Sequence, residues 1–265
     1  MKVSDNMKIK KGKSMCFFSA KGGVGKTTNI LNFAGIFEQL EKKVLVIDMD
    51  LYSGGIALYL NKSNDRSVYN MSFDLMNGSF TTFDNYTIKV DNYIDVLAAP
   101  KDPRDANKVE VQSIKTIIDK ACEIYDVVLI DTNHALNDIN LMVLDSVDEI
   151  MFFITNDPLD LKNIRSLLSI LDNLKIKNYS LLLNNSRDPF KSYFSLYEMR
   201  KIINHDINYS LSADMYLKDM EKLVMKGAIV SLDRKFADVM TDDYKTFVLM
   251  ATDLLERNSS KWVDY

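Results

Sequence analysis

The chain has 265 residues, of which 47% are hydrophobic and 26% charged, with a formal net charge of -4. This composition is typical of a folded globular protein and gives no overall attraction to nucleic acid or to an anionic membrane. No apolar run is long enough to cross a membrane and the N-terminus lacks a signal-peptide core, so we expect a cytoplasmic protein. The two cysteines, Cys16 and Cys122, lie in apolar patterns without metal-ligand spacing, which indicates buried thiols in a reducing compartment.

Apolar strand-like runs alternate with helical patterns along the chain. The runs typical of strands cover residues 14–19, 43–50, 92–99, 126–132, 149–155, 179–185 and 207–212. Apolar residues recur at helical spacing over residues 26–42, 111–125, 160–174 and 242–257. Residues 62–91 are more polar and give no clear assignment. Strands too apolar to alternate, joined by helices, predict an α/β three-layer sandwich whose mainly parallel sheet is flanked by helices on both faces.

The stretch FFSAKGGVGKTTNIL, residues 17–31, joins the first predicted strand to the first predicted helix. Its glycines allow the backbone to curl with N–H groups pointing inward, and the new helix adds its N-terminal dipole to this anion site. This order of strand, glycine-rich turn and helix predicts a phosphate-binding loop. The nucleotide-binding residues that the pattern predicts are Gly22, Gly23, Val24, Gly25, Lys26, Thr27 and Thr28. The alternative is a glycine turn that merely joins a strand to a helix.

Three residues at the end of this stretch carry the expected chemistry. Lys26 is predicted to reach the β/γ-phosphates, the Thr27 hydroxyl to bind Mg²⁺, and Thr28 to reach the α-phosphate. A strict match to the pattern needs glycine at position 20, but Ala20 stands there and a second lysine, Lys21, follows it. On the pattern alone, Lys21 is either a functional residue or a surface lysine at a turn.

Three aspartates follow predicted strands. Asp48 and Asp50 end the run VLVIDMD, and Asp131 ends the run YDVVLIDT. Ligands of parallel α/β sheets collect outside the carboxyl ends of the strands, which places all three carboxylates beside the loop. Because Mg²⁺ keeps several waters, one or two carboxylates are enough to hold it. Any single aspartate here could instead cap a helix or a turn.

The sequence KGGVGKTT resembles the deviant Walker A motif of the ParA/MinD group of ATPases, and VLVIDMDLYSGGIALYL resembles the next motif of that group. The resemblance runs from about residue 14 to about residue 255. It implies a homodimer with two ATP molecules, each with Mg²⁺, between the subunits, and hydrolysis of ATP to ADP and phosphate, which the departures from the family pattern given below indicate to be slow. It also implies a single P-loop ATPase domain over residues 14–258, between a flexible lead-in, residues 1–13, and a short tail, residues 259–265.

The resemblance assigns a role to each charged residue of the site. Lys21 would reach across the dimer interface to the partner's nucleotide, beside Lys26 as the ordinary phosphate contact. Asp50 would orient the attacking water. Thr27, Asp48 and Asp131 would support the metal ion, the last two also supporting the switch regions.

An adenine pocket is implied by two further segments. SLLLNN resembles the family strand whose asparagine hydrogen-bonds the base, which would be Asn184. LSAD resembles the segment that lines the base, near Ser212 and Asp214, although the family commonly has proline where Ser212 stands. Asn184 could also be a turn residue after a strand.

The segment DMDLYSGGIALYL resembles the TadZ/CpaE branch, as do LAAPKDPRDAN, residues 97–107, and GAIVSLDRK, residues 227–235. That branch implies a switch that localises or assembles a pilus or secretion machine of the Tad type and binds its assembly proteins. The chain departs from the family pattern in two places. Asn133 and His134 replace a frequent diproline, and Gly55 stands where TadZ/CpaE sequences often have aspartate.

Three alternatives remain at this stage. A ParA-like partitioning ATPase would bind DNA, for which the mixed charges around Arg187 and Arg200 give little support. A MinD-like ATPase would have a basic amphipathic C-terminal helix, whereas the helix here carries acids and the tail with Trp262 is not basic, so no direct membrane anchor is expected. The altered switch segment and Gly55 suggest a third alternative, a scaffold that binds nucleotide but barely hydrolyses it.

Overall fold

The computed structural model describes residues 11–63, 65–187, 193–213, 226–233 and 235–256. Their strands form one eight-stranded sheet in the order β3-β4-β2-β5-β1-β6-β7-β8. All neighbouring strands are parallel except β3, which pairs antiparallel with β4 at one edge. The strands are β1 (Lys13–Phe18), β2 (Val44–Met49), β3 (Ile88–Lys89), β4 (Ile94–Leu97), β5 (Val127–Thr132), β6 (Glu149–Ile154), β7 (Tyr179–Asn184) and β8 (Tyr209–Leu211).

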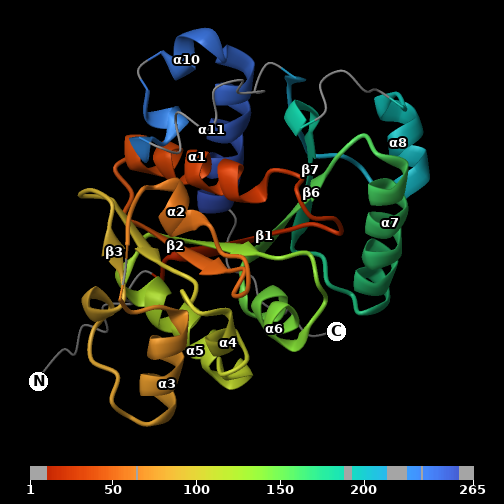
Figure 1. The fold of residues 1–265 in the computed structure, drawn as a ribbon. Helices are drawn as coiled ribbons and strands as arrows, with labels where there is room; N and C mark the ends of the chain where they lie inside the picture. The colour runs from red at the N-terminus through yellow and green to blue at the C-terminus, as the bar shows by residue number, and fades with distance from the viewer. Residues whose placement is uncertain (1–10, 64, 188–192, 214–225, 234, 257–265) are drawn as a thin grey trace, which may run out of the picture.

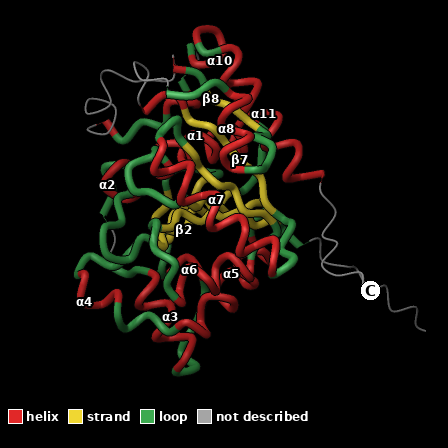
Figure 2. Tube along the Cα trace, turned by 90° about the vertical axis from the view of Figure 1, so that its right-hand side faces the viewer, coloured by secondary structure: helices red, strands yellow, loops and turns green. Residues whose placement is uncertain are grey.

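Helices cover both faces of this sheet. One face packs against α1, η4, α10 and α11, and the other against α3, α5, α6, α7 and α8, so the described residues form two hydrophobic cores (Figure 1). Figure 2 shows the strands as one layer between α1 on one side and α5 and α6 on the other. The α-helices are α1 (Lys26–Gln39), α2 (Ile56–Tyr59), α3 (Val68–Met76), α4 (Pro103–Ala106), α5 (Val111–Ile124), α6 (Asp138–Ser146), α7 (Pro158–Asn173), α8 (Leu196–Ile203), α10 (Phe236–Val239) and α11 (Thr241–Glu256). The 3-10 helices are η1 (Phe83–Asn85), η2 (Asn185–Arg187) and η4 (Val230–Leu232).

The central strands are apolar and are buried on both faces. Every residue of β2, β5 and β6 is buried, because both faces of each strand are covered by helices. The register of β2 against β5 sets Asp48 beside Asp131, and that of β1 against β5 sets Phe17 beside Asp131. The sheet therefore gathers the ends of β1, β2 and β5 at one edge, where the predicted loop begins.

The predicted fold class is confirmed: the structure is an α/β sandwich with a mainly parallel sheet and helices on both faces. Both cysteines are buried in it, as expected. The polar stretch 62–91, which received no assignment, contains α3, η1 and the antiparallel strand β3. Within the described residues, no helix is both long and apolar enough to span a bilayer. Residues 1–10 of the lead-in, the whole tail 259–265 with Trp262, and Asp214 lie outside those residues.

Candidate functional site

The turn between β1 and α1 is a tight loop that needs glycine at two positions. Gly23 has φ +75° and Gly25, which caps α1, has φ +95°, both in the left-handed region that residues with a side chain rarely adopt. The Ser19 hydroxyl donates to the carbonyl of Lys21 at 2.7 Å and so fixes the first turn of the loop. The loop then leads into the N-terminus of α1, the position of an anion-binding loop.

Lys26 lies inside this loop. Its side chain is buried, and its Nζ donates to the Ser19 hydroxyl at 2.7 Å, the one hydrogen bond that it makes among the described residues. Burial lowers the pKa of Lys26, although the charges of Asp131, Asp50 and Asp160 oppose this effect. A buried ammonium group with unused donors is suited to receive a phosphate group.

Asp131 lies opposite Thr27, at the end of β5. The Thr27 hydroxyl donates to Asp131 Oδ2 at 2.6 Å, while the buried Oδ1 has no hydrogen-bond partner. Burial raises the pKa of Asp131 to about 6, against the opposing effects of Thr27 and Lys26. A buried carboxylate oxygen without a partner, next to a threonine hydroxyl, fits a site for a hard divalent cation such as Mg²⁺.

Asp48 behaves differently from Asp131, although both were predicted to support the metal. Its two oxygens accept the backbone N–H groups of Asp50, at 3.2 Å, and Ile56, at 3.1 Å. A Cβ at Gly54 would lie 2.7 Å from Asp48 Oδ2, so the segment needs glycine to come this close. Burial and the neighbouring Asp131 raise the pKa of Asp48 well above its usual range. In this conformation Asp48 anchors the segment after β2.

Asp50 follows β2 and is partly exposed, in contrast to Asp48. Its charge acts on both Lys26 and Asp131, which places it beside the predicted phosphate site. The strand ends therefore bring together three of the predicted site residues, Lys26, Asp50 and Asp131. Their roles in catalysis and metal binding remain predictions.

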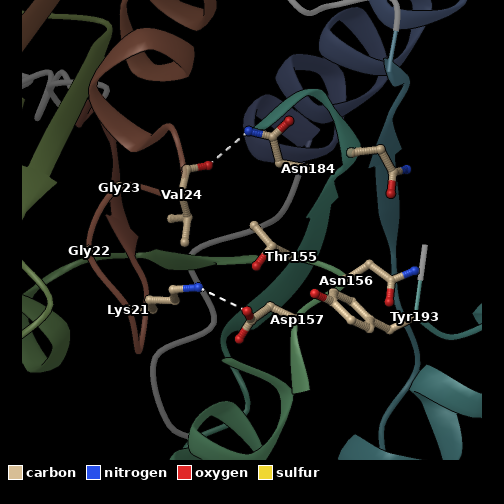
Figure 3. A pocket seen from close by; sticks show the side chains of 10 residues that line it. Lys21, Gly22, Gly23, Val24, Thr155, Asn156, Asp157, Asn184 and Tyr193 are labelled. Carbon is tan, nitrogen blue, oxygen red and sulfur yellow. Dashed lines mark hydrogen bonds and ion pairs between the residues drawn. The ribbon is translucent and has the colours of Figure 1, made fainter. Parts of the chain in front are cut away.

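Lys21 lies at the outer edge of the loop and borders a pocket of about 160 Å³ (Figure 3). Its Nζ forms an ion pair with Asp157 Oδ2 at 3.1 Å, and its side chain is 41% exposed. The residues that line the pocket are Lys21, Gly22, Gly23, Val24, Thr155, Asn156, Asp157, Asn184, Asn185 and Tyr193. The two lysines of the loop thus have opposite environments, one buried and one at the surface.

Asn184 ties the loop to the end of β7. Its Nδ2 donates to the carbonyl of Val24 at 2.9 Å, and its Oδ1 accepts hydrogen bonds from the backbone and hydroxyl of Ser186. Both ends of the amide are used within the protein, so in this conformation Asn184 positions the loop. Ser212 follows β8, and its backbone N–H and hydroxyl donate to Asp243. Binding of a base by Asn184, Ser212 and Asp214 remains a prediction.

The segment after β5 is held by asparagines. Asn140, on α6, donates to Asn133 Oδ1 at 2.7 Å and to the carbonyl of Ala135 at 2.6 Å, and Asn137 caps α6. The exposed His134 lies against the loop, since a Cβ at Gly22 would lie 3.4 Å from His134 Nδ1. The asparagines thus fix the part of the chain that replaces the family diproline.

Sequence patterns did not indicate Ser19, Asn140 or Asp157 as residues of the site. Asp157 was detectable in part, because an aspartate followed by proline is typical of a helix N-terminus. Its contact with Lys21, however, joins segments 136 residues apart, and sequence patterns carry no such information. Ser19 is visible only as the last polar residue before the loop.

The fold and the loop together define the class of protein as a P-loop nucleoside triphosphatase. The model of the AAA_31 family, described as an AAA domain, matches residues 12–184, well over half of the chain. The chain therefore belongs to this family, the ParA/MinD family of P-loop ATPases.

Curated relatives carry names from cell division and chromosome partitioning. The chain is 26% identical over 170 residues to the putative septum site-determining protein MinD of Emiliania huxleyi, covering 64% of this chain and 61% of the relative. It is 25% identical over 203 residues to the chromosome-partitioning ATPase Soj of Treponema pallidum, covering 74% of this chain and 76% of the relative. The chain thus spans less than two thirds of the first of these relatives.

Solved structures show the same fold. A ParA family ATPase from Chlorobium tepidum superposes with a TM-score of 0.79 at 19% identity, covering 90% of this chain and 98% of that one. The septum site-determining protein MinD of Pyrococcus horikoshii, solved with Mg-ADP, gives 0.73 at 16% identity, covering 91% and 95%. None of these four relatives is a pilus-assembly protein, so the predicted TadZ/CpaE branch gains no support from them.

Proposed function

We propose that this chain is an ATP-dependent switch that binds Mg-ATP in its phosphate loop, forms a homodimer around it and hydrolyses it slowly. The observation that carries the proposal is the pair of lysines in one loop. Lys26 is buried and faces the predicted phosphate site, whereas Lys21 is at the surface. Lys26 is enough to serve the nucleotide of its own subunit. Lys21 is exposed enough to reach a nucleotide on a second copy of the chain once it leaves its ion pair with Asp157.

The proposed chemistry follows from the positions of four side chains. Bound Mg-ATP would supply the phosphoryl group, and its Mg²⁺ would supply positive charge against the phosphate oxygens. Lys26 and the loop N–H groups bind the phosphates, while Thr27 and Asp131 hold the cation. Asp50 orients the attacking water. Positioning and charge stabilisation account for most of catalysis in phosphoryl transfer, and these residues supply both.

The cellular role that we propose is spatial positioning or partitioning rather than pilus assembly. The relatives named above are septum-site and chromosome-partitioning proteins, which favours the alternative over the TadZ/CpaE hypothesis. A solved complex of MinC and MinD from Aquifex aeolicus is also similar, with a TM-score of 0.67 at 19% identity. We propose by analogy that the ATP-bound dimer of this chain presents a surface to a partner protein.

The test replaces Lys21 by alanine. We expect Lys21→Ala to raise the dissociation constant of the ATP-bound dimer by about 100-fold, because two charged contacts worth about tenfold each are lost from a symmetric dimer. Binding of ATP to the monomer should change little, since Lys26 is intact. Sedimentation and fluorescent-nucleotide titration measure the two quantities. Lys89→Ala, which removes an exposed lysine from the edge strand β3, is the matched control. A Lys21→Ala protein that dimerises like the control would refute the proposal.

A further inference from the structure

Lys21 is not free in this structure, because its own subunit already provides it with an anion. Lys21 Nζ and Asp157 Oδ2 lie 3.1 Å apart, and Figure 3 shows the lysine reaching from the loop toward the start of α7. The side chain of Asp157 is 32% exposed, so the pair lies at the mouth of the pocket. The backbone of Lys21 is held separately by the Ser19 hydroxyl. The side chain can therefore change direction without moving the loop.

Asp157 is a fixed acceptor. Its Oδ1 caps α7 by accepting the N–H groups of Leu159, at 3.0 Å, and Asp160, at 2.9 Å. Pro158 at the first helical position further restricts the backbone. These bonds occupy one carboxylate oxygen and leave the other aimed at Lys21. The N–H of Asp160 and the charge of Lys21 hold the pKa of Asp157 below its usual range, so the carboxylate stays ionised at neutral pH.

A second acid strengthens the negative field at this point. Asp160 is buried beneath Asp157, where its Oδ2 accepts the backbone N–H and hydroxyl of Thr155, both at 2.7 Å. Its charge is felt by Lys21 as well as by Lys26. Neither carboxylate of this turn has a role in the proposed binding of the chain's own nucleotide.

The geometry points to Asp157 as a positioning residue that holds Lys21 on its own subunit and so competes with the phosphates of a partner's nucleotide. This inference rests on the proposed function. Asp157 and the phosphates of a partner's nucleotide compete for the same ammonium group, so Lys21 gives up its ion pair with Asp157 as it reaches across an interface. The dimer then forms only when the attraction of Lys21 to the partner's nucleotide exceeds its attraction to Asp157. Asp157 thereby raises the threshold for assembly.

The test replaces Asp157 by asparagine, which caps helices as well as aspartate does but carries no charge. An exposed ion pair contributes a factor of about 1.4 to 5, and a symmetric dimer opens two. We therefore expect Asp157→Asn to lower the dissociation constant of the ATP-bound dimer by roughly 2- to 30-fold. Asp138→Asn is the matched control, since it removes an exposed aspartate from the first turn of α6. Sedimentation with saturating Mg-ATP gives the constants.

Two further measurements separate this role from a structural one. In the nucleotide-free protein, Lys21 should react faster with an amine-modifying reagent in Asp157→Asn than in the wild type, with Lys89 as the internal reference. The double variant Lys21→Ala/Asp157→Asn should dimerise no more tightly than Lys21→Ala alone. A double variant that dimerises more tightly than Lys21→Ala would show that Asp157 acts through another group, and unchanged labelling would show that the pair does not form; either result overturns the inference.

The outcomes also separate the inference from the proposed function. A wild-type dimer that Asp157→Asn does not strengthen beyond Asp138→Asn overturns the inference alone. If the wild type and Asp157→Asn both stay monomeric with ATP, the proposed dimeric switch is wrong, and the inference falls with it.

Discussion

Asp131 is a buried acid that lowers the stability of the nucleotide-free protein and that we propose as a ligand of the metal ion. It is buried, one oxygen has no hydrogen-bond partner, and burial raises its pKa to about 6. At neutral pH the nucleotide-free protein therefore holds an ionised carboxylate in an unfavourable environment. A bound cation would remove this cost, as metal sites commonly do, because it pairs with the charge.

The residue-scale prediction is that Asp131→Asn stabilises the nucleotide-free protein and weakens binding of Mg-nucleotide. The amide oxygen can still accept from Thr27, but the buried charge is gone. A raised pKa of this size corresponds to about 3 kcal/mol, of which we expect a part to appear as a melting temperature several degrees higher. Calorimetry and titration of nucleotide with and without Mg²⁺ measure both effects. A lower melting temperature with unchanged Mg²⁺ dependence would contradict it.

At the scale of elements, α1 is held in place by η4, a 3-10 helix that lies near the C-terminal end of the chain. Ser231 of η4 donates its hydroxyl to the carbonyl of Asn32, at 2.7 Å, and its N–H to the Asn32 side chain, at 3.1 Å. The close approach depends on Gly35, where a Cβ would lie 2.3 Å from Ser231 Oγ. Since α1 begins at the phosphate loop, η4 supports the loop from the far side of the helix.

We expect Gly35→Ala to destabilise the protein by about 1–3 kcal/mol, despite the better helix propensity of alanine, because the methyl group meets a hydrogen-bonded side chain. Chemical denaturation monitored by circular dichroism measures the change. Gly55→Ala is the control, because a Cβ there would meet Tyr59 at 3.4 Å, an ordinary contact. Equal stability of the two variants would show that η4 moves freely to make room.

Features formed by residues close together in the sequence could be predicted, whereas contacts between distant segments could not. The loop, Lys26 and the Asp131 strand end are local patterns, and the sequence was enough to place them. The contacts of Asp157 with Lys21, Asn184 with Val24 and Ser231 with Asn32 join distant segments, so no pattern announces them. The helix α3 was missed because the stretch 62–91 around it is polar, although α3 itself is mostly apolar and buries residues against the core that includes α5.

For the whole molecule, two acids with raised pKa set the response of stability to pH: Asp131, which is buried, and Glu38, which is half-buried. Burial raises the pKa of Glu38, near the Asp91 carboxylate, to about 7, and that of Asp131 to about 6. Because these folded-state values lie above the unfolded ones, the stability they contribute is full below about pH 4 and is lost as the pH rises through 6 and 7. Exposed acids with lowered pKa, such as Asp102 at about 2, act only in the more acidic range.

We therefore expect the melting temperature of the nucleotide-free protein to be highest near pH 5 and to fall steadily toward pH 8. Glu38→Gln should flatten the upper part of this decline and leave the melting temperature at pH 5 almost unchanged. Differential scanning fluorimetry across this range is sufficient. If the melting temperatures of the wild type and Glu38→Gln fall in parallel as the pH rises, deprotonation of Glu38 does not cause this part of the decline.

The central place of β1 in the sheet has a consequence for how such a protein can diverge. On one side of β1 lie β2 and β5, whose ends carry Asp50 and Asp131; on the other lie β6 and β7, whose ends lead to Asp157 and carry Asn184. The loop that follows β1 lies between these two groups of residues. Under the proposed function, mutations on the first side would change the rate of hydrolysis, whereas mutations on the second side would change dimerisation.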